Sequence, residues 1–128
     1  MIALLDTHAF IWMDSEPDRV PSTVLAYLAD PECEVFLSFA SLWEITIKVT
    51  TKKLVLRKSL EEIVAENLRD TPLRLLPVRV EHIYALSNLP SIHKDPFDRM
   101  LVSQAIVENA ILLTVDPMIR KYPVRTDW

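Results

Sequence analysis

The sequence has 128 residues, of which half are hydrophobic and a quarter charged, and this composition predicts a single globular domain over residues 1–128. Glycine is absent, which argues against phosphate-binding P-loops, the dinucleotide-binding fingerprint and the nucleophile elbow, because each of these motifs requires glycine. The net charge of −4 does not favour binding of polyanions through a generally basic surface.

Cysteine content and hydropathy place the chain in a reducing, non-membrane setting. Cys33 is the only cysteine, which excludes an internal disulfide and a multi-cysteine zinc site, so a cytoplasmic location is expected. No apolar run approaches the roughly 20 residues that a membrane helix needs.

The first predicted element is a strand over residues 1–5, whose apolar run leads into Asp6. A run this short is too short for a signal sequence and is typical of a buried parallel strand. In an open α/β sheet, ligands bind beyond the carboxyl ends of the strands, where the strand order reverses. Asp6 is therefore predicted to project a carboxylate where a site would lie.

The following segments are predicted from capping and turn residues. Thr7 is expected to cap a short helix over residues 7–13, and a polar loop follows over residues 14–19. A second helix begins near Pro21, and residues 34–37 form the second strand.

Ser41 and Glu44 match the capping-box pattern and predict the start of the next helix. Helical spacing directs Leu42, Ile45 and Val49 toward a core. The far end of this helix and the segment after it are basic, with Lys48, Lys52, Lys53, Arg57 and Lys58.

The second half of the chain repeats the alternation of helices and strands. Ser59 and Glu62 form a second capping box at the start of an amphipathic helix. Asp95 and Pro96 mark the start of a helix that should run to about Asn109 and be largely buried. Further strands are expected over residues 73–77, 111–115 and 124–126, and further helices over residues 80–87 and 118–121. This order predicts an α/β fold, with a mostly parallel sheet of about four to five strands and helices on both faces.

Four acids are expected at one edge of this sheet. Asp6 and Asp116 follow strands, whereas Glu44 and Asp98 lie in the first turns of helices. Crowded carboxylates repel one another unless a cation lies between them, and oxygen ligands favour Mg²⁺ or Mn²⁺ over zinc. Such a site suits phosphodiester hydrolysis. Each acid also has a structural interpretation: Glu44 completes a capping box, Asp98 complements a helix dipole, and Asp116, like Asp95, is a candidate N-cap.

The chain resembles a PIN-domain ribonuclease of the VapC toxin type. The matching segments, in the order of the family, are Leu4-Leu-Asp6-Thr-His-Ala-Phe-Ile-Trp12, Ser41-Leu-Trp-Glu44-Ile-Thr-Ile-Lys48, His93-Lys-Asp95-Pro-Phe-Asp98-Arg-Met-Leu-Val-Ser-Gln-Ala105 and Thr114-Val-Asp116. The resemblance implies an α/β/α sandwich, Mg²⁺-dependent cleavage of RNA, a homodimer, and a small antitoxin that covers the site.

The resemblance also implies roles for individual residues. Asp6 and Asp98 correspond to the main metal ligands, and Glu44 and Asp116 complete the catalytic quartet. Thr114 is where the family often places a hydroxyl that orients the site. Asp95 belongs to the same motif and is interpreted as the helix cap, with Asp98 pointing inward. The contacts expected to RNA phosphates are Lys48, Lys52, Lys53, Arg57 and Lys58, although a solvated basic face is the alternative.

Other interpretations of the acids fit less well. A haloacid-dehalogenase-type site needs a second Asp two positions after the first, where this chain has His8. A receiver domain needs an Asp after a middle strand, but the third predicted strand of this chain ends in Leu76 and Pro77. Two alternatives stay open: a PIN-like protein-interaction module without catalysis, and a nuclease of RNA processing that is not a toxin. His8, His82 and His93 lack a metal-ligand pattern, and Trp12 and Trp43 are expected in the core or at an interface.

Overall fold

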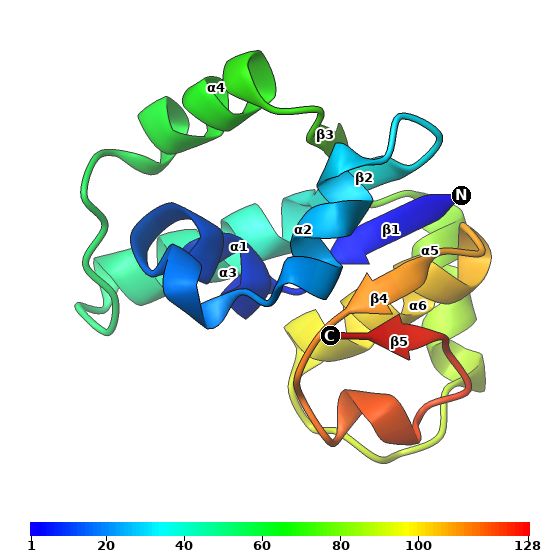
Figure 1. Ribbon diagram of the computed structural model, residues 1–128. Coiled ribbons are helices and arrows are strands. Elements are labelled where there is room, and N and C mark those ends of the chain that lie inside the picture. The colour runs from blue at the N-terminus through cyan, green and yellow to red at the C-terminus, as the bar shows by residue number, and fades with distance from the viewer.

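The chain folds around one parallel sheet of five strands, as the computed structural model, which describes residues 1–128, shows (Figure 1). The strands are β1 (Ile2–Leu5), β2 (Glu34–Ser38), β3 (Arg74–Leu76), β4 (Ile111–Leu113) and β5 (Thr126–Asp127). Their order across the sheet is β3-β2-β1-β4-β5, and every neighbouring pair is parallel. The predicted sheet is confirmed, and it is parallel throughout.

Helices cover both faces of the sheet, which confirms the three-layer α/β/α sandwich (Figure 1). The α-helices are α1 (Thr7–Ser15), α2 (Ser22–Ala29), α3 (Phe39–Thr50), α4 (Leu60–Asp70), α5 (Val80–Ala85) and α6 (Pro96–Val107). The 3₁₀ turns are η1 (Pro17–Arg19), η2 (Leu86–Asn88) and η3 (Ile119–Lys121). No helix combines the length and the apolar character that crossing a membrane requires.

Alternate residues of β1 enter two separate cores, because successive side chains of a strand point to opposite faces. Ala3 and Leu5 belong to the core that α1 to α4 cover. Leu4 belongs to the core on the other face, where it packs with Leu101 of α6 and Leu112 of β4. All three β1 residues are fully buried, so the short apolar run that opens the sequence is the centre of both layers.

The strand order reverses next to β1. From β1 the chain proceeds to β2 and β3 on one side, and it then crosses to β4 and β5 on the other side. In sheets of this kind the crevice at the reversal, outside the carboxyl ends of the strands, is the usual ligand site. Asp6 follows β1 directly, and Thr114 follows β4 directly.

The predicted start of α3 is wrong by one turn. The helix begins at Phe39, and the N-cap is Ser38, whose hydroxyl accepts a hydrogen bond from the Ala40 backbone N–H at 2.9 Å. Ser41 lies inside the helix and accepts a hydrogen bond from the Thr7 hydroxyl at 2.9 Å. Glu44 therefore lies in the second turn of α3, where it has no capping role.

Other boundaries also differ from the prediction. Thr7 is the first residue of α1 and does not cap it, because its hydroxyl bonds to α3. The helix continues to Ser15 and η1 follows, so the expected polar loop is mostly helical. β5 starts two residues later than predicted, at Thr126.

The other two predicted N-caps are confirmed. Ser59 accepts a hydrogen bond from the Glu62 backbone N–H at 3.2 Å and begins α4. Asp95 Oδ1 accepts hydrogen bonds from the backbone N–H groups of Phe97 and Asp98 at 2.8 and 3.3 Å. Asp95 is therefore occupied as a helix cap, and the next acid of the motif, Asp98, is left for another role.

Truncation of a central strand residue should test this account of the core. Leu37 of β2 is fully buried, so we expect Leu37→Ala to lower the free energy of unfolding by roughly 2–5 kcal/mol. Val55 is 89% exposed, and Val55→Ala should change stability by less than about 0.5 kcal/mol. Urea unfolding followed by circular dichroism measures both values, and equal losses for the two variants would contradict the assignment of the core.

Candidate metal centre

Four acids from distant parts of the sequence gather at the carboxyl edge of the sheet. Asp6 follows β1, Asp116 follows β4, and Glu44 and Asp98 reach the same edge from α3 and α6. Burial, together with the negative charges of Asp6, Asp95, Glu44 and Asp116, raises the pKa of Asp98 to about 8. The acids are thus close enough for each to affect the ionisation of Asp98.

Asp6 is 3% exposed and has one oxygen that is anchored and one that is not. Its Oδ2 accepts a hydrogen bond from the Thr114 hydroxyl at 2.6 Å, whereas its Oδ1 is buried without any hydrogen-bond partner. Burial raises the pKa of Asp6, although the Thr114 hydrogen bond acts in the opposite direction. The Thr114 hydroxyl also accepts the Asp116 backbone N–H at 3.1 Å, so it links the segments that carry two of the acids.

Glu44 has the same arrangement as Asp6. It is 4% exposed, its Oε2 lies 2.9 Å from Lys48 Nζ one turn along α3, and its buried Oε1 has no partner. Unpaired oxygens of buried carboxylates are costly, and most buried polar atoms in folded proteins have a partner. Two such oxygens at one edge of the sheet therefore need an explanation.

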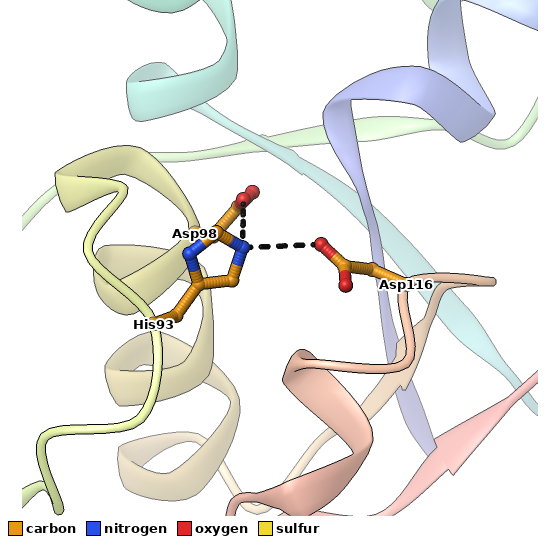
Figure 2. Close-up of side chains that lie close together, drawn as sticks. All are labelled: His93, Asp98 and Asp116. Atoms are coloured by element: carbon orange, nitrogen blue, oxygen red, sulfur yellow. Dashed lines mark hydrogen bonds and ion pairs between the residues drawn. The ribbon is translucent and has the colours of Figure 1, made fainter.

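His93 joins the other two acids, as Figure 2 shows. Its Nε2 lies 3.1 Å from Asp98 Oδ2 and 3.2 Å from Asp116 Oδ2. The second oxygen of Asp116 accepts the Met118 backbone N–H at 2.8 Å, so Asp116 shapes the turn before η3. The N-cap of η3 is Met118, so the prediction of Asp116 as an N-cap is wrong.

His93 lacks a metal-ligand pattern in the sequence, but the structure places it beside two of the acids. One ligand atom from each of His93, Asp98 and Asp116 lies within 4.8 Å of the others. The only sequence signal was the position of His93 two residues before Asp95, inside the motif that carries Asp98. His82 by contrast is fully buried, and its Nε2 lies 3.0 Å from Glu108 Oε2, away from the four acids.

The donor set fits a hard divalent cation. The buried oxygens of Asp6 and Glu44 are unpartnered, and burial, together with the neighbouring acids, raises the pKa of Asp98. A cation that carboxylate oxygens ligate would compensate both features. Asp6, Glu44, Asp98 and Asp116 are the residues that could hold it.

The basic residues predicted to contact RNA fall into two groups. Arg57 Nη2 lies 2.7 Å from Asp14 and 2.6 Å from Glu66, and Lys58 is also paired with Glu66. These two residues are therefore engaged within the protein. Lys52 and Lys53 form no salt bridge. Lys52 lies two residues after the end of α3, in the left-handed conformation, with φ of 61°.

A groove of about 450 Å³ lies beside the acids, between α3 and the start of α6. Glu44 and Asp95 form its acidic lining, and Lys48, Lys53 and Lys94 supply three ammonium groups. The groove thus places cationic side chains next to the acidic edge, despite the negative charge of the whole chain.

The two tryptophans, predicted in the core or at an interface, differ in their surroundings. Trp12 packs against the core on the α1 side. Trp43 is 65% exposed and is not a core residue, and its ring meets Phe97 edge to face at 5.1 Å between centroids.

Residues 3–124 match the family model described as "PIN domain". Among solved structures, the chain is similar to VapBC2 from Rickettsia felis bound to a promoter DNA fragment, with 18% identity, a TM-score of 0.75, and coverage of 99% of this chain and 98% of that one. It is also similar to VapBC-1 from nontypeable Haemophilus influenzae, with 18% identity, a TM-score of 0.70, and coverage of 99% and 97%. The chain is similar as well to FitAcB from Neisseria gonorrhoeae, with 22% identity, a TM-score of 0.65, and coverage of 98% of this chain and 96% of that one. A comparison with curated protein sequences gives no match.

The ionisation of Asp98 should make the metal-free protein less stable as the pH rises. The pKa of Asp98 is about 8 in the folded protein and 3.8 for an ordinary Asp, so the folded state holds the extra proton between these values. The stability that this proton contributes is complete below about pH 4, is lost progressively from pH 4 to pH 8, and is absent above pH 8.

Asp98→Asn cannot ionise and should remove this loss. In EDTA at pH 8.5 we expect the variant to exceed the wild type in free energy of unfolding by at least about 1.4 kcal/mol, the equivalent of one pKa unit. Urea unfolding from pH 5 to pH 8.5 measures the difference, with Asp18→Asn in the exposed turn η1 as the control. Parallel pH profiles for the wild type and Asp98→Asn would contradict a raised pKa.

Proposed function

The chain belongs to the PIN-domain family, and on this premise we propose that it is a metal-dependent ribonuclease that hydrolyses RNA phosphodiester bonds. We propose further that it is the toxin of a toxin–antitoxin pair and that residues 1–128 act as a single domain. The observation that carries the catalytic proposal is the pair of buried, unpartnered carboxylate oxygens on Asp6 and Glu44, at an edge shared with Asp98 and Asp116.

In this proposal Asp6 and Asp98 are the main ligands of Mg²⁺, with Mn²⁺ as the alternative, and Glu44 and Asp116 complete the site. Such an ion, when bound, neutralises the scissile phosphate and lowers the pKa of water. Thr114 holds Asp6 through the 2.6 Å hydrogen bond and thereby keeps Oδ1 free to act as a ligand. Lys48 holds Glu44 in the same way through Oε2.

RNA phosphates are proposed to bind along the groove beside the acids. Lys48, Lys53 and Lys94 line it, and Lys48 is also paired with Glu44. Lys52 follows α3, the helix that carries Lys48, and is a further candidate for a phosphate contact. Arg57 and Lys58, which are paired with acids of the protein, are better explained as structural residues.

The proposed protein partners are a small antitoxin and a second copy of the chain. Solved complexes named VapBC and FitAcB have folds similar to this chain, and this supports the antitoxin proposal. An apolar groove of about 500 Å³ between α3, α5 and α6 is lined by residues such as Trp43, Ile83 and Met100. This face supports the homodimer proposal, since exposed apolar patches mark interaction sites. A cytoplasmic location follows from the proposed RNA substrate.

The nuclease proposal is tested with purified protein freed of any antitoxin. We expect it to cleave a structured RNA in Mg²⁺ and to lose activity in EDTA. Asp6→Asn should lower the cleavage rate at least about 100-fold, because charge stabilisation by a metal ion contributes several kcal/mol. Gel analysis of end-labelled RNA measures the rates, and Asp18→Asn serves as the matched control. Failure of the folded, partner-free protein to cleave a broad set of RNAs would favour a protein-interaction module.

The groove lysines are tested through the salt dependence of RNA binding. In the Asp6→Asn background, removing Lys53 or Lys94 should reduce the slope of log affinity against log salt by about 0.7 each, the value for one phosphate contact on a single strand. Lys58→Ala is the control, because Lys58 is paired with Glu66. Fluorescence anisotropy with a labelled oligonucleotide measures the slopes. A slope that changes only in Lys58→Ala would place the RNA elsewhere.

A further inference from the structure

The side chain of His93 contacts two of the four acids, Asp98 and Asp116, and the three residues come from three different segments of the chain. It lies in the loop before α6, whereas Asp98 lies on α6 and Asp116 follows β4. The position of this loop is set by Tyr122, whose buried hydroxyl accepts the His93 backbone N–H at 2.7 Å. Arg99 donates to the same hydroxyl at 3.1 Å and to the Pro90 carbonyl at 2.9 Å. His93 is thus held at the site from its backbone.

The hydrogen bonds of the imidazole identify which nitrogen carries the proton. Nδ1 accepts the Asp95 backbone N–H at 3.2 Å, so this nitrogen presents its lone pair. The ring proton is therefore on Nε2, the nitrogen that faces Asp98 and Asp116 (Figure 2). A protonated Nε2 cannot ligate a metal, and a ligating histidine normally donates its other N–H to an acceptor, the reverse of what is seen at Nδ1.

We infer that His93 is a positioning residue, which holds Asp116 through a hydrogen bond from Nε2–H and Asp98 through the 3.1 Å contact of the same nitrogen, and which does not itself ligate the metal. This inference rests on the proposed function, because Asp98 and Asp116 are metal ligands only if that function is correct. Without this donor, no hydrogen bond or ion pair joins the two carboxylates. With it, the contact to Asp98 is made through Oδ2, and Oδ1 is left for the metal.

The direct test is Mn²⁺ binding to the intact protein, followed by electron paramagnetic resonance without RNA. We expect His93→Ala to weaken Mn²⁺ binding by about 10- to 100-fold, the usual effect of losing a group that orients metal ligands. His93→Gln should recover most of this loss, because its amide N–H can reach the place of Nε2–H but its amide nitrogen is not a metal ligand. Unchanged or tighter binding in His93→Ala, or a His93→Gln variant as weak as His93→Ala, would overturn the inference.

The tautomer of the wild-type ring gives a second test that needs no variant. In ¹⁵N-labelled protein, long-range ¹H–¹⁵N spectra should report a proton on Nε2 of His93 both in EDTA and in saturating Mg²⁺. Loss of that proton on addition of Mg²⁺ would make His93 a ligand and overturn the positioning role.

Asp6→Asn separates failure of this inference from failure of the proposed function. If the wild type and Asp6→Asn bind Mn²⁺ equally, or if neither binds it, the proposed metal site is wrong. If Asp6→Asn loses affinity and His93→Ala does not, the metal site stands and only the role of His93 is wrong.

Discussion

Repulsion among carboxylates at one edge of the sheet is the constraint around which the site is built. The protein meets it with one anchoring donor for each acid: Thr114 for Asp6, Lys48 for Glu44, and His93 for both Asp98 and Asp116. Each acid is contacted by its donor through a single oxygen, and in Asp6 and Glu44 the second oxygen is left buried and unpaired. The acids are therefore oriented with buried oxygens left unpaired, which a cation between them would compensate.

The sandwich supplies the rigid frame for this arrangement. β1 is paired on both sides, by β2 and by β4, and its residues are shared between two cores. The reversal of strand order beside β1 opens the crevice, and the helices that follow the strands bring further acids to it. Asp95 caps α6 and so leaves Asp98, one turn further, directed to the site.

Local patterns in the sequence predicted most of the fold but not the contacts between distant segments. The parallel sheet followed from short apolar runs, and the caps at Ser59 and Asp95 followed from local spacing. The start of α3 was misplaced because Ser38 and Ser41 can both cap a helix, and the contact that engages Ser41 comes from Thr7, 34 residues away. The role of His93 depends in part on Asp116, 23 residues later, and the pairing of Arg57 depends on Asp14, 43 residues earlier. No local pattern carries that information.

The wide spacing of the site along the chain has a consequence for the order of folding. The hydrogen bond between Thr114 and Asp6 spans 108 residues, and β1 gains its second neighbour only when β4 is present. Contacts of such long range form late, because closing a long loop costs entropy before the contact can repay it. During synthesis Asp6 and Glu44 therefore leave the ribosome well before Thr114 and Asp116, and the four acids assemble only when nearly the whole chain is available.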